Sequence, residues 1–216
     1  MRIFQYFKNL LRRTTIYKSY TDYKWEKYSL QFGCISRTST VALESHFNPH
    51  NLYLHDNVNI MMGFTLISRR GRFIMHEGSA AAQGLTVITD SHIRALGKTF
   101  KDESLWDKDE AETFGDVVVE KDVWIGSQVC LLPNVTIGRG VNIGTGSVVR
   151  NNVPPYAIVI GNPGKIIGFI FTPEEIIEHE KALYPEGERL PFELLEKNYE
   201  KYFLKRLKEI KEFTRI

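Results

Sequence analysis

The sequence has few cysteines, almost no net charge and no long apolar run. Its 216 residues include two cysteines, Cys34 and Cys130, which are too few for a disulfide framework or a zinc site of four thiolates. Lys and Arg exceed Asp and Glu by two, 28 against 26, so no strong field attracts nucleic acid and a charged partner must meet a local patch. No apolar stretch reaches the roughly 18 residues that span a bilayer. We expect one folded domain with appendages, in the reducing cytoplasm.

The first 20 residues combine basic and apolar side chains. They contain no acidic residue, and their apolar side chains recur at a spacing of three and four. The cations are Arg2, Lys8, Arg12, Arg13 and Lys18. This pattern predicts a basic amphipathic helix, and its apolar run is too interrupted for a signal peptide. Such a helix either packs on its own protein or a neighbouring subunit, or makes peripheral contact with the anionic inner face of a membrane.

A six-residue repeat begins at residue 119 and reads VEKDVW, IGSQVC, LLPNVT, IGRGVN, IGTGSV, VRNNVP. Each unit opens with an aliphatic residue and has a small or β-branched residue in its fifth position. A period of six does not fit an α-helix, but it fits a parallel β-helix with one hexad on each face of a triangular prism. The opening residues are therefore expected to point inward and to stack on one another.

The fourth position of each hexad is where the chain turns a corner between faces. It is occupied by Asp122, Gln128, Asn134, Gly140, Gly146 and Asn152. Gly and Asn tolerate a positive φ better than other residues, and such corners require it. The repeat therefore predicts a left-handed coil.

Upstream, the same pattern is interrupted. LHDNVN, IMMGFT and LISRRG fit from residue 54, the register slips by three residues, and the repeat resumes with MHEGSA from residue 75. Residues 93–116 fit no hexad and predict a long excursion, a kind of loop that is often functional. We refer to residues 93–116 as the excursion.

The repeat places a prism at residues 52–160, and the chain divides into three regions. An N-terminal helical or irregular region (1–51) precedes the β-helix domain (52–170), which a helical extension (171–216) follows. Thr172, Pro173 and Glu175 form a capping box with proline at the first helical position, which predicts a helix to about Tyr184. A second, longer amphipathic helix is expected from Phe192 onward. The fold class is mainly β: a left-handed parallel β-helix of hexapeptide repeats with a long excursion loop, a basic N-terminal helix and a C-terminal helical tail.

Six consecutive hexads that end in VPPYAIVIGNPGK resemble the hexapeptide-repeat acyltransferases, over roughly residues 52–170. The resemblance implies a left-handed β-helix, a homotrimer and acetyl-CoA as co-substrate. The combination of ITDSH, a long excursion and GNPGK is similar to the O-acetyltransferases that act on sugars of capsule or lipopolysaccharide, which are related to xenobiotic acetyltransferases that modify antibiotics. The tail FTPEEIIEHEKALYPEGERLP is also typical of bacterial surface-sugar enzymes.

Acetyl transfer to a hydroxyl needs a base, and histidine has the ordinary pKa that best suits this role at neutral pH. His92 ends the hexad VITDSH immediately before the excursion, and this context matches the family's catalytic histidine. Asp90 lies two residues earlier and projects to the same side of an extended strand. It either orients the imidazole, binds substrate hydroxyls, or is a plain corner residue without function.

The coenzyme is expected to lie along the later coils. Gly126 and Ser127 begin the uninterrupted coils, and a backbone amide beside a glycine is a candidate donor to the oxyanion at the thioester carbon. The resemblance places the closing motif GNPGK near the nucleotide, where Lys165 supplies a positive charge for a phosphate. The coenzyme-binding residues that we expect are Gly126, Ser127, Gly144, Ser147, Arg150 and Lys165.

Together these features predict an acetyl-CoA-dependent O-acetyltransferase that acts on a sugar hydroxyl in surface polysaccharide biosynthesis. We expect direct transfer in a ternary complex, because neither cysteine is placed as an obvious nucleophile. The alternatives are acetylation of an antibiotic or another small hydroxyl or amine acceptor, and a non-catalytic β-helix binding module. A zinc enzyme of the γ-carbonic-anhydrase type shares the fold but needs three histidines. Only His76 and His92 lie in suitable coils, so no metal is expected.

The flat faces of a lone prism predict assembly. Phe64, Leu85 and Trp124 are expected to be exposed on these faces, and a site built on one face would leave its substrate half in water. Three prisms with their excursions extended over a neighbour would enclose a cleft between each pair, which closed cyclic symmetry allows. We therefore expect a homotrimer whose active sites, with a sugar or glycan acceptor, lie between subunits.

Overall fold

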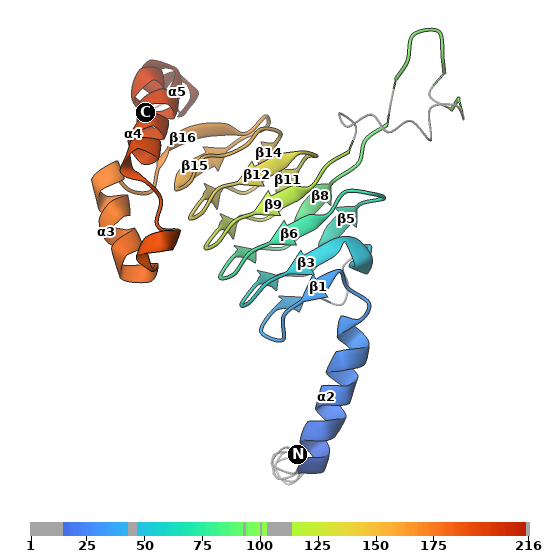
Figure 1. The fold of residues 1–216 in the computed structure, drawn as a ribbon. Helices are drawn as coiled ribbons and strands as arrows, with labels where there is room; N and C mark the ends of the chain where they lie inside the picture. The colour runs from blue at the N-terminus through green and yellow to red at the C-terminus, as the bar shows by residue number, and fades with distance from the viewer. Residues whose placement is uncertain (1–14, 43–46, 93, 100, 103–113, 215–216) are drawn as a thin grey trace, which may run out of the picture.

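The protein winds into a three-sided prism with helices at both ends, as the computed structural model shows (Figure 1). The structure describes residues 15–42, 47–92, 94–99, 101–102 and 114–214. Successive strands lie on three faces, and from β3 (Leu52–Leu54) to β14 (Val148–Val149) each coil contributes one strand to each of three sheets, in which these strands pair in parallel. This architecture is a left-handed parallel β-helix, and the prediction of fold class is confirmed.

The three faces are named A, B and C in chain order. Face A holds β1 (Cys34–Ile35), β3 (Leu52–Leu54), β6 (Phe73–Met75), β9 (Val117–Val119) and β12 (Val135–Ile137). Face B holds β2 (Thr40–Val41), β4 (Asn59–Ile60), β7 (Ala80–Ala81), β10 (Trp124–Ile125), β13 (Asn142–Ile143), β15 (Ala157–Ile160) and β16 (Lys165–Phe169). Face C holds β5 (Thr65–Ile67), β8 (Thr86–Ile88), β11 (Cys130–Leu131) and β14 (Val148–Val149).

The core of the prism contains the opening and the fifth residues of the hexads. Ile125 on β10 pairs with Ile143 of the next coil and with Ala81 of the previous one. All six predicted opening residues are buried, namely Val119, Ile125, Leu131, Ile137, Ile143 and Val149. Burial of such stacked aliphatic side chains stabilises the coil by about 25 cal/mol for each Å² removed from water.

The corners confirm the expected backbone with one exception. Positive φ angles occur at Asp122, Gln128, Asn134, Gly140 and Gly146. Asn152 does not adopt one; instead its side-chain carbonyl accepts the Thr136 N–H at 2.8 Å. In this last coil the left-handed residue is Tyr156, with a φ of 61°. The preceding Pro154 and Pro155 fix their own φ angles near −65°, so the turn is displaced past them.

The prism begins earlier than residue 52, because β1 pairs with β3 and β2 pairs with β4. At the corner between faces A and B, this first coil carries Thr38 where the following coils carry Asn57, Gly78, Asp122 and Gly140 with positive φ angles. Ser39 is buried, and its hydroxyl donates to the His55 carbonyl while it accepts the Val58 N–H at 2.9 Å. Ser79 makes the same two kinds of contact in a coil that the hexad pattern does reveal. The first coil is therefore hidden by Thr38, which takes the place of the corner glycine or asparagine.

Two of the three aromatic and aliphatic residues expected on the faces are instead in the core. Phe64 and Leu85 are fully buried, because each occupies the inward-pointing fifth position of its hexad. Trp124 is 50% exposed on face B. The prediction for Phe64 and Leu85 was wrong, and their exposure gives no argument for assembly.

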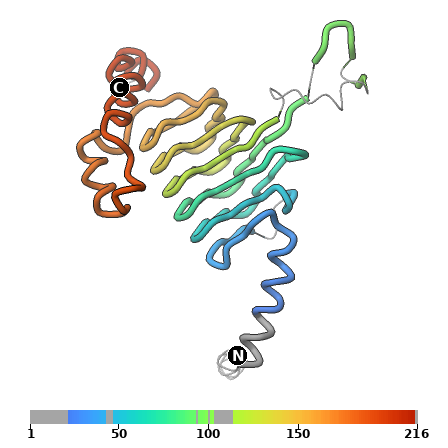
Figure 2. Tube along the Cα trace, in the orientation of Figure 1, coloured from blue at the N-terminus to red at the C-terminus, as the bar shows by residue number. Residues whose placement is uncertain are grey.

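Helices and an aromatic stack close the N-terminal end of the prism. Helix α2 (Thr15–Ser29) and the short helix η1 (Pro49–Asn51) flank the first strands. The rings of Tyr28, Phe32, Phe47 and Phe64 follow one another with centroids 4.9 to 5.9 Å apart. Figure 2 shows α2 extending from this end, opposite to the C-terminus. The basic helix predicted within the first 20 residues falls largely outside the described residues.

The C-terminal tail covers the other end of the prism. Strand β16 runs antiparallel to β15, and helix α3 (Pro173–Leu183) begins with the predicted capping box, in which Thr172 accepts the Glu175 N–H and Glu175 accepts the Thr172 N–H. The short helix η3 (Glu186–Glu188) follows. No helix in the described part of the chain is long and apolar enough to cross a membrane.

The second tail helix is not continuous as predicted. It divides into α4 (Phe192–Tyr202), η4 (Leu204–Arg206) and α5 (Leu207–Thr214). The break occurs at Phe203, whose φ and ψ of −122° and −67° lie outside the helical range. Because the chain bends there, α5 returns to the prism, and Phe213 lies against Gly161 and Lys165 at the β15–β16 turn.

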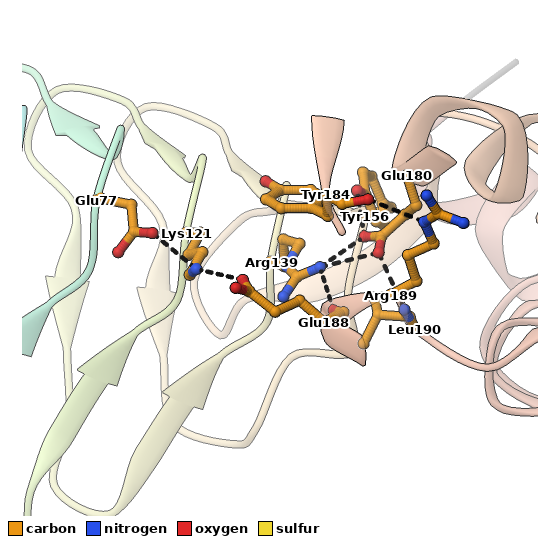
Figure 3. A network of polar contacts seen from close by, with 9 residues as sticks. All are labelled: Glu77, Lys121, Arg139, Tyr156, Glu180, Tyr184, Glu188, Arg189 and Leu190. Carbon is orange, nitrogen blue, oxygen red and sulfur yellow. Dashed lines mark hydrogen bonds and ion pairs between the residues drawn. The ribbon is translucent and has the colours of Figure 1, made fainter. Parts of the chain in front are cut away.

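A buried polar network fastens the tail to the prism (Figure 3). Glu180 of α3 is completely buried and accepts the Tyr156 hydroxyl at 2.7 Å, the Arg139 guanidinium at 2.9 Å and the Leu190 N–H at 3.0 Å. Burial and the hydrogen bond to Glu180 raise the pKa of Tyr156. At the edge of the network, Lys121 bridges Glu77 and Glu188 at 2.7 and 2.8 Å.

Candidate functional site

The chain leaves the prism for the excursion at the corner between faces C and A. Strand β8 ends at Ile88, and the next residues, Thr89 and Asp90, meet the returning end of the excursion. The Gly115 N–H donates to the Thr89 carbonyl at 2.9 Å, and Asp90 forms an antiparallel bridge with Phe114. The two ends of the excursion are therefore held side by side on the prism.

A tight turn at residues 68–72, here called the basic turn, lies against this corner. It contains Arg69, Arg70 and Arg72 and follows β5. The Asp90 carboxylate accepts the backbone N–H groups of Arg69 at 2.9 Å, Arg70 at 3.1 Å and Gly71 at 3.4 Å. The Thr89 hydroxyl donates to the same carboxylate at 2.6 Å. Burial opposes ionisation of Asp90, but these hydrogen bonds outweigh it and lower the pKa of Asp90.

The basic turn is also tied to the returning end of the excursion. Arg72 donates from its backbone N–H and its guanidinium to the Asp116 carboxylate, at 2.8 and 3.0 Å, and this lowers the pKa of Asp116. The Arg70 guanidinium lies 4.5 Å from the centre of the Phe114 ring. A Cβ atom on Gly71 would lie 2.7 Å from the Gly115 carbonyl oxygen, so this close approach requires glycine. Three chain segments thus form one rigid unit.

His92 follows this unit directly. Its side chain is exposed, and it lies two residues after Asp90, at the point where the excursion departs. The structure therefore brings His92, Asp90 and the basic turn together at one corner. Because Asp90 is fixed by four hydrogen bonds, the start of the excursion is held in place next to the imidazole.

Four of the predicted coenzyme residues, Gly126, Ser127, Gly144 and Ser147, lie on the later coils at the corner between faces B and C. Gly126 and Gly144 follow adjacent strands of face B, and their N–H groups donate to Ile143 and Val159 carbonyls at 2.8 Å. Among the described residues, no acceptor is found for the Ser127 N–H. Ser147 is fully buried; its hydroxyl donates to the Gly144 carbonyl at 2.6 Å and accepts the Gly161 N–H at 3.1 Å.

The two predicted cations lie still further along the prism. Arg150 follows β14 and is exposed. Lys165 begins β16, where its ammonium lies 3.8 Å from a Glu209 carboxylate oxygen and 4.7 Å from the centre of the Phe213 ring. Arg150 lies at the corner between faces C and A, the same corner as His92 but on a later coil. In one subunit, face C separates the corner that carries His92 from the corner that carries Gly126, Ser127, Gly144 and Ser147. A site that uses both therefore needs either a long ligand or a second subunit.

Comparison with known proteins agrees with this architecture. The family model for the bacterial transferase hexapeptide (six repeats) matches residues 116–151. A hexapeptide-repeat containing acetyltransferase of Vibrio cholerae, solved in complex with acetyl coenzyme A, superposes with a TM-score of 0.57 at 25% identity, over 68% of this chain and 78% of that one. Residues 116–151 therefore match the hexapeptide-repeat model, and the chain is similar in fold to hexapeptide-repeat acetyltransferases.

The chain is also similar to two further acetyltransferases. A maltose O-acetyltransferase of Clostridium difficile shares the fold, with a TM-score of 0.56 at 22% identity over 76% of this chain and 82% of that one. A chloramphenicol acetyltransferase of Klebsiella aerogenes is 48% identical over 68 residues, which are 32% of each chain. The chain thus spans about a third of the length of the curated relatives it matches.

The basic turn is a feature of this hexapeptide-repeat protein that the sequence argument missed. Its signal was the three-residue slip in the repeat after LISRRG, because extra residues at a corner must bulge from the prism. His76, the other histidine in a suitable coil, lies on face A and stacks on His55 with ring centroids 4.5 Å apart. Burial and the neighbouring His55 lower the pKa of His76. In the described part of the chain, no three His, Cys, Asp or Glu side chains gather to hold a metal ion.

Replacement of Asp90 by asparagine is expected to destabilise this hexapeptide-repeat protein more at neutral pH than in acid. The ordinary pKa of Asp90 is 3.8, and the folded protein lowers it. At pH values above the ordinary pKa, the Asp90 carboxylate is ionised and stabilises the folded protein fully. This stabilisation is lost as the pH falls through the lower pKa that Asp90 has in the folded protein. Urea unfolding at pH 7 and pH 3 measures the difference between wild type and Asp90→Asn. A difference that is equal at both pH values would contradict this account.

Proposed function

We propose that the protein is an acetyl-CoA-dependent O-acetyltransferase that acts on a sugar hydroxyl, in surface polysaccharide biosynthesis in the cytoplasm. The observation that carries this proposal is the position of His92, exposed beside a rigid corner where the excursion leaves a hexapeptide-repeat prism. The acetyl-CoA complex of the Vibrio cholerae relative supports the donor. The sugar acceptor is supported by the resemblance of the tail to surface-sugar enzymes.

In this proposal His92 is the general base. It accepts the proton of the acceptor hydroxyl as that oxygen attacks the thioester carbonyl, and the CoA thiolate is released as the tetrahedral intermediate collapses. Asp90 acts as a positioning residue, because its carboxylate holds the basic turn and the start of the excursion. No enzyme-bound acetyl group is needed.

The oxyanion of that intermediate needs preorganised donors. Of the two predicted candidates, the Gly126 N–H is used by the Ile143 carbonyl, whereas the Ser127 N–H has no acceptor among the described residues. We therefore assign the oxyanion contact to Ser127, with Gly126 and Gly144 leaving room for the pantetheine arm. Ser147 shapes the same corner from inside the prism. Arg150 and Lys165 are placed to bind phosphates of the coenzyme.

The state of the cysteines supports direct transfer. Cys130 lies on face C between Thr86 and Val148 and is partly buried. Burial raises the pKa of the Cys130 thiol, which leaves less of the nucleophilic thiolate at neutral pH. A covalent acetyl-cysteine intermediate at this position is therefore disfavoured.

Assembly completes the proposed site. His92 lies at one edge of face C, and Ser127 lies at the opposite edge. A homotrimer would place the His92 corner of one subunit over the Ser127 corner of its neighbour. The half-exposed Trp124 on face B is available to this contact.

The test of this proposal is release of CoA thiol from acetyl-CoA in the presence of a panel of acceptors. Mono- and disaccharides, their nucleotide-linked forms and chloramphenicol would be compared, and acetyl-CoA binding would be measured separately by calorimetry. Thiol release with a saccharide supports the proposal. Failure to bind acetyl-CoA overturns it and leaves a non-catalytic binding module.

A second candidate is acetylation of an antibiotic or another small acceptor. The 48% identity to a chloramphenicol acetyltransferase favours it, over a segment that covers 32% of each chain. In the same assay, turnover with chloramphenicol but with no saccharide would select this candidate. The chemistry and the role of His92 would be unchanged.

A further inference from the structure

We propose that the acceptor carries an anionic group, a carboxylate or a phosphate, and that Arg69 binds it. This inference rests on the proposed function, because it takes His92 as the base beside which the acceptor lies. It concerns the basic turn, residues 68–72, which no hexad explains and which the structure fixes against the His92 corner.

The three arginines of the basic turn have different surroundings. Arg72 is paired with Asp116, and Arg70 lies over the Phe114 ring. Arg69 is exposed, and no carboxylate of the described residues pairs with its guanidinium. Its backbone, in contrast, is fixed by the 2.9 Å hydrogen bond from its N–H to Asp90. Within the described part of the chain, Arg69 is thus a cation without a carboxylate partner on a rigid turn.

The rigidity links Arg69 to the reacting hydroxyl. The Asp90 carboxylate holds the N–H groups of Arg69, Arg70 and Gly71 and precedes His92 by two residues. The hydrogen bond from the Arg69 N–H to the Asp90 carboxylate therefore sets the distance between the Arg69 backbone and the His92 backbone. A planar guanidinium binds a carboxylate or phosphate through two parallel hydrogen bonds. Arg69 would in this way orient the acceptor so that one hydroxyl faces the imidazole.

The coenzyme is not the source of this anion. Its phosphates are separated from its thioester by the length of the pantetheine arm, and the thioester must be at the base. An anion bound beside His92 therefore belongs to the acceptor. Moreover, Arg150 and Lys165 lie on later coils, away from the basic turn. The acceptor chemistry that fits is a sugar acid or a phosphorylated sugar.

The test compares charged and neutral sugars of the same shape, without acetyl-CoA. Binding of methyl glucuronide, glucose 1-phosphate and methyl glucoside would be titrated by NMR with wild type, Arg69→Gln and Arg37→Gln. Arg37 is the matched control, because it is an exposed arginine that pairs with Asp22 at the corner between faces A and B, a different corner from the one that carries the basic turn. Wild type and Arg37→Gln are expected to bind one of the anionic sugars about tenfold more tightly than the glucoside. Arg69→Gln should bind the charged and neutral sugars equally.

The outcomes separate this inference from the proposed function. Preference for glucuronide or for glucose 1-phosphate identifies the anion, and 0.5 M salt should weaken that preference because exposed charges are screened. The inference is overturned if wild type binds charged and neutral sugars equally, or binds neither detectably. It is also overturned if Arg69→Gln loses affinity for acetyl-CoA but not for the anionic sugars. If the preference is present but no acetyl group is transferred to any acceptor, only the proposed function fails.

Discussion

Replacement of His92 by alanine is expected to lower kcat/KM for acetyl transfer by a factor of about 10²–10⁴. Without the imidazole, the attacking hydroxyl must lose its proton to water, although the coenzyme and the acceptor are still held in place. The loss should therefore fall on the rate of thiol release and not on the affinity for acetyl-CoA. Thiol release and calorimetric binding of acetyl-CoA, measured on the same preparation, give the two quantities.

His179→Gln is the matched control for this experiment. His179 lies on α3 in the tail and contacts the rings of Tyr156 and Phe171, away from the corner of the excursion. Its replacement should leave kcat/KM close to that of wild type. Transfer by His92→Ala at the wild-type rate would show that another group is the base. A parallel loss of acetyl-CoA affinity in His92→Ala would instead assign His92 to coenzyme binding.

The sequence allowed the prism to be predicted in detail because its constraints repeat. Each hexad must place an apolar side chain in the core at its first position and adopt a positive φ angle at its fourth position. Ile125 and Gly140 meet these two demands. Where a different residue type stands at the fourth position, the pattern is lost: the first coil has Thr38 at the corner where the next two coils have Asn57 and Gly78. The last corner escapes the rule because two prolines displace the turn to Tyr156.

The candidate site was less accessible to sequence reasoning because its parts are joined by backbone hydrogen bonds. His92 stands out in the sequence by its position before the excursion. The partners of Asp90, in contrast, are N–H groups of residues 69–71, some 20 positions earlier in the chain, and any residue type except proline supplies an N–H. The pairing of Arg72 with Asp116 spans the whole excursion. Neither contact requires residues at a fixed spacing in the sequence, so no sequence motif predicts it.

The structure of the C-terminal tail could also be predicted only where it depends on local sequence. The capping box of Thr172 and Glu175 is local, and the helix it predicts is present. The bend at Phe203 depends on packing of α5 against the β15–β16 turn, which lies about 40 residues earlier. The polar network around Glu180 likewise joins the tail to Arg139 and Tyr156 of the prism. Local signals therefore predicted where helices begin, and contacts between distant residues decided where they end and what they cover.

Replacement of Glu180 by alanine is expected to lower the free energy of unfolding by about 3–5 kcal/mol, because it leaves the partly buried Arg139 guanidinium without its carboxylate. The Arg139 side chain is 12% exposed and that of Glu180 is 0% exposed, so water cannot fully replace the lost partner. The Tyr156 hydroxyl and the Leu190 N–H lose an acceptor in the same step. Urea unfolding measures the change in free energy, and hydrogen exchange of the α3 amides reports whether the tail opens first.

Two further variants show whether the effect comes from the network. Glu178→Ala removes an exposed carboxylate from the same helix and should change the free energy of unfolding by less than about 0.5 kcal/mol. Combining Glu180→Leu with Arg139→Met removes both charges, and it should cost less than Glu180→Ala alone, because no unpaired buried charge is left behind. If Glu180→Ala were as stable as Glu178→Ala, the network would not fasten the tail. If the double variant were the least stable of all, the attraction within the Glu180–Arg139 ion pair would itself hold α3 on the prism. The cost of Glu180→Ala would then not come from an unpaired buried charge.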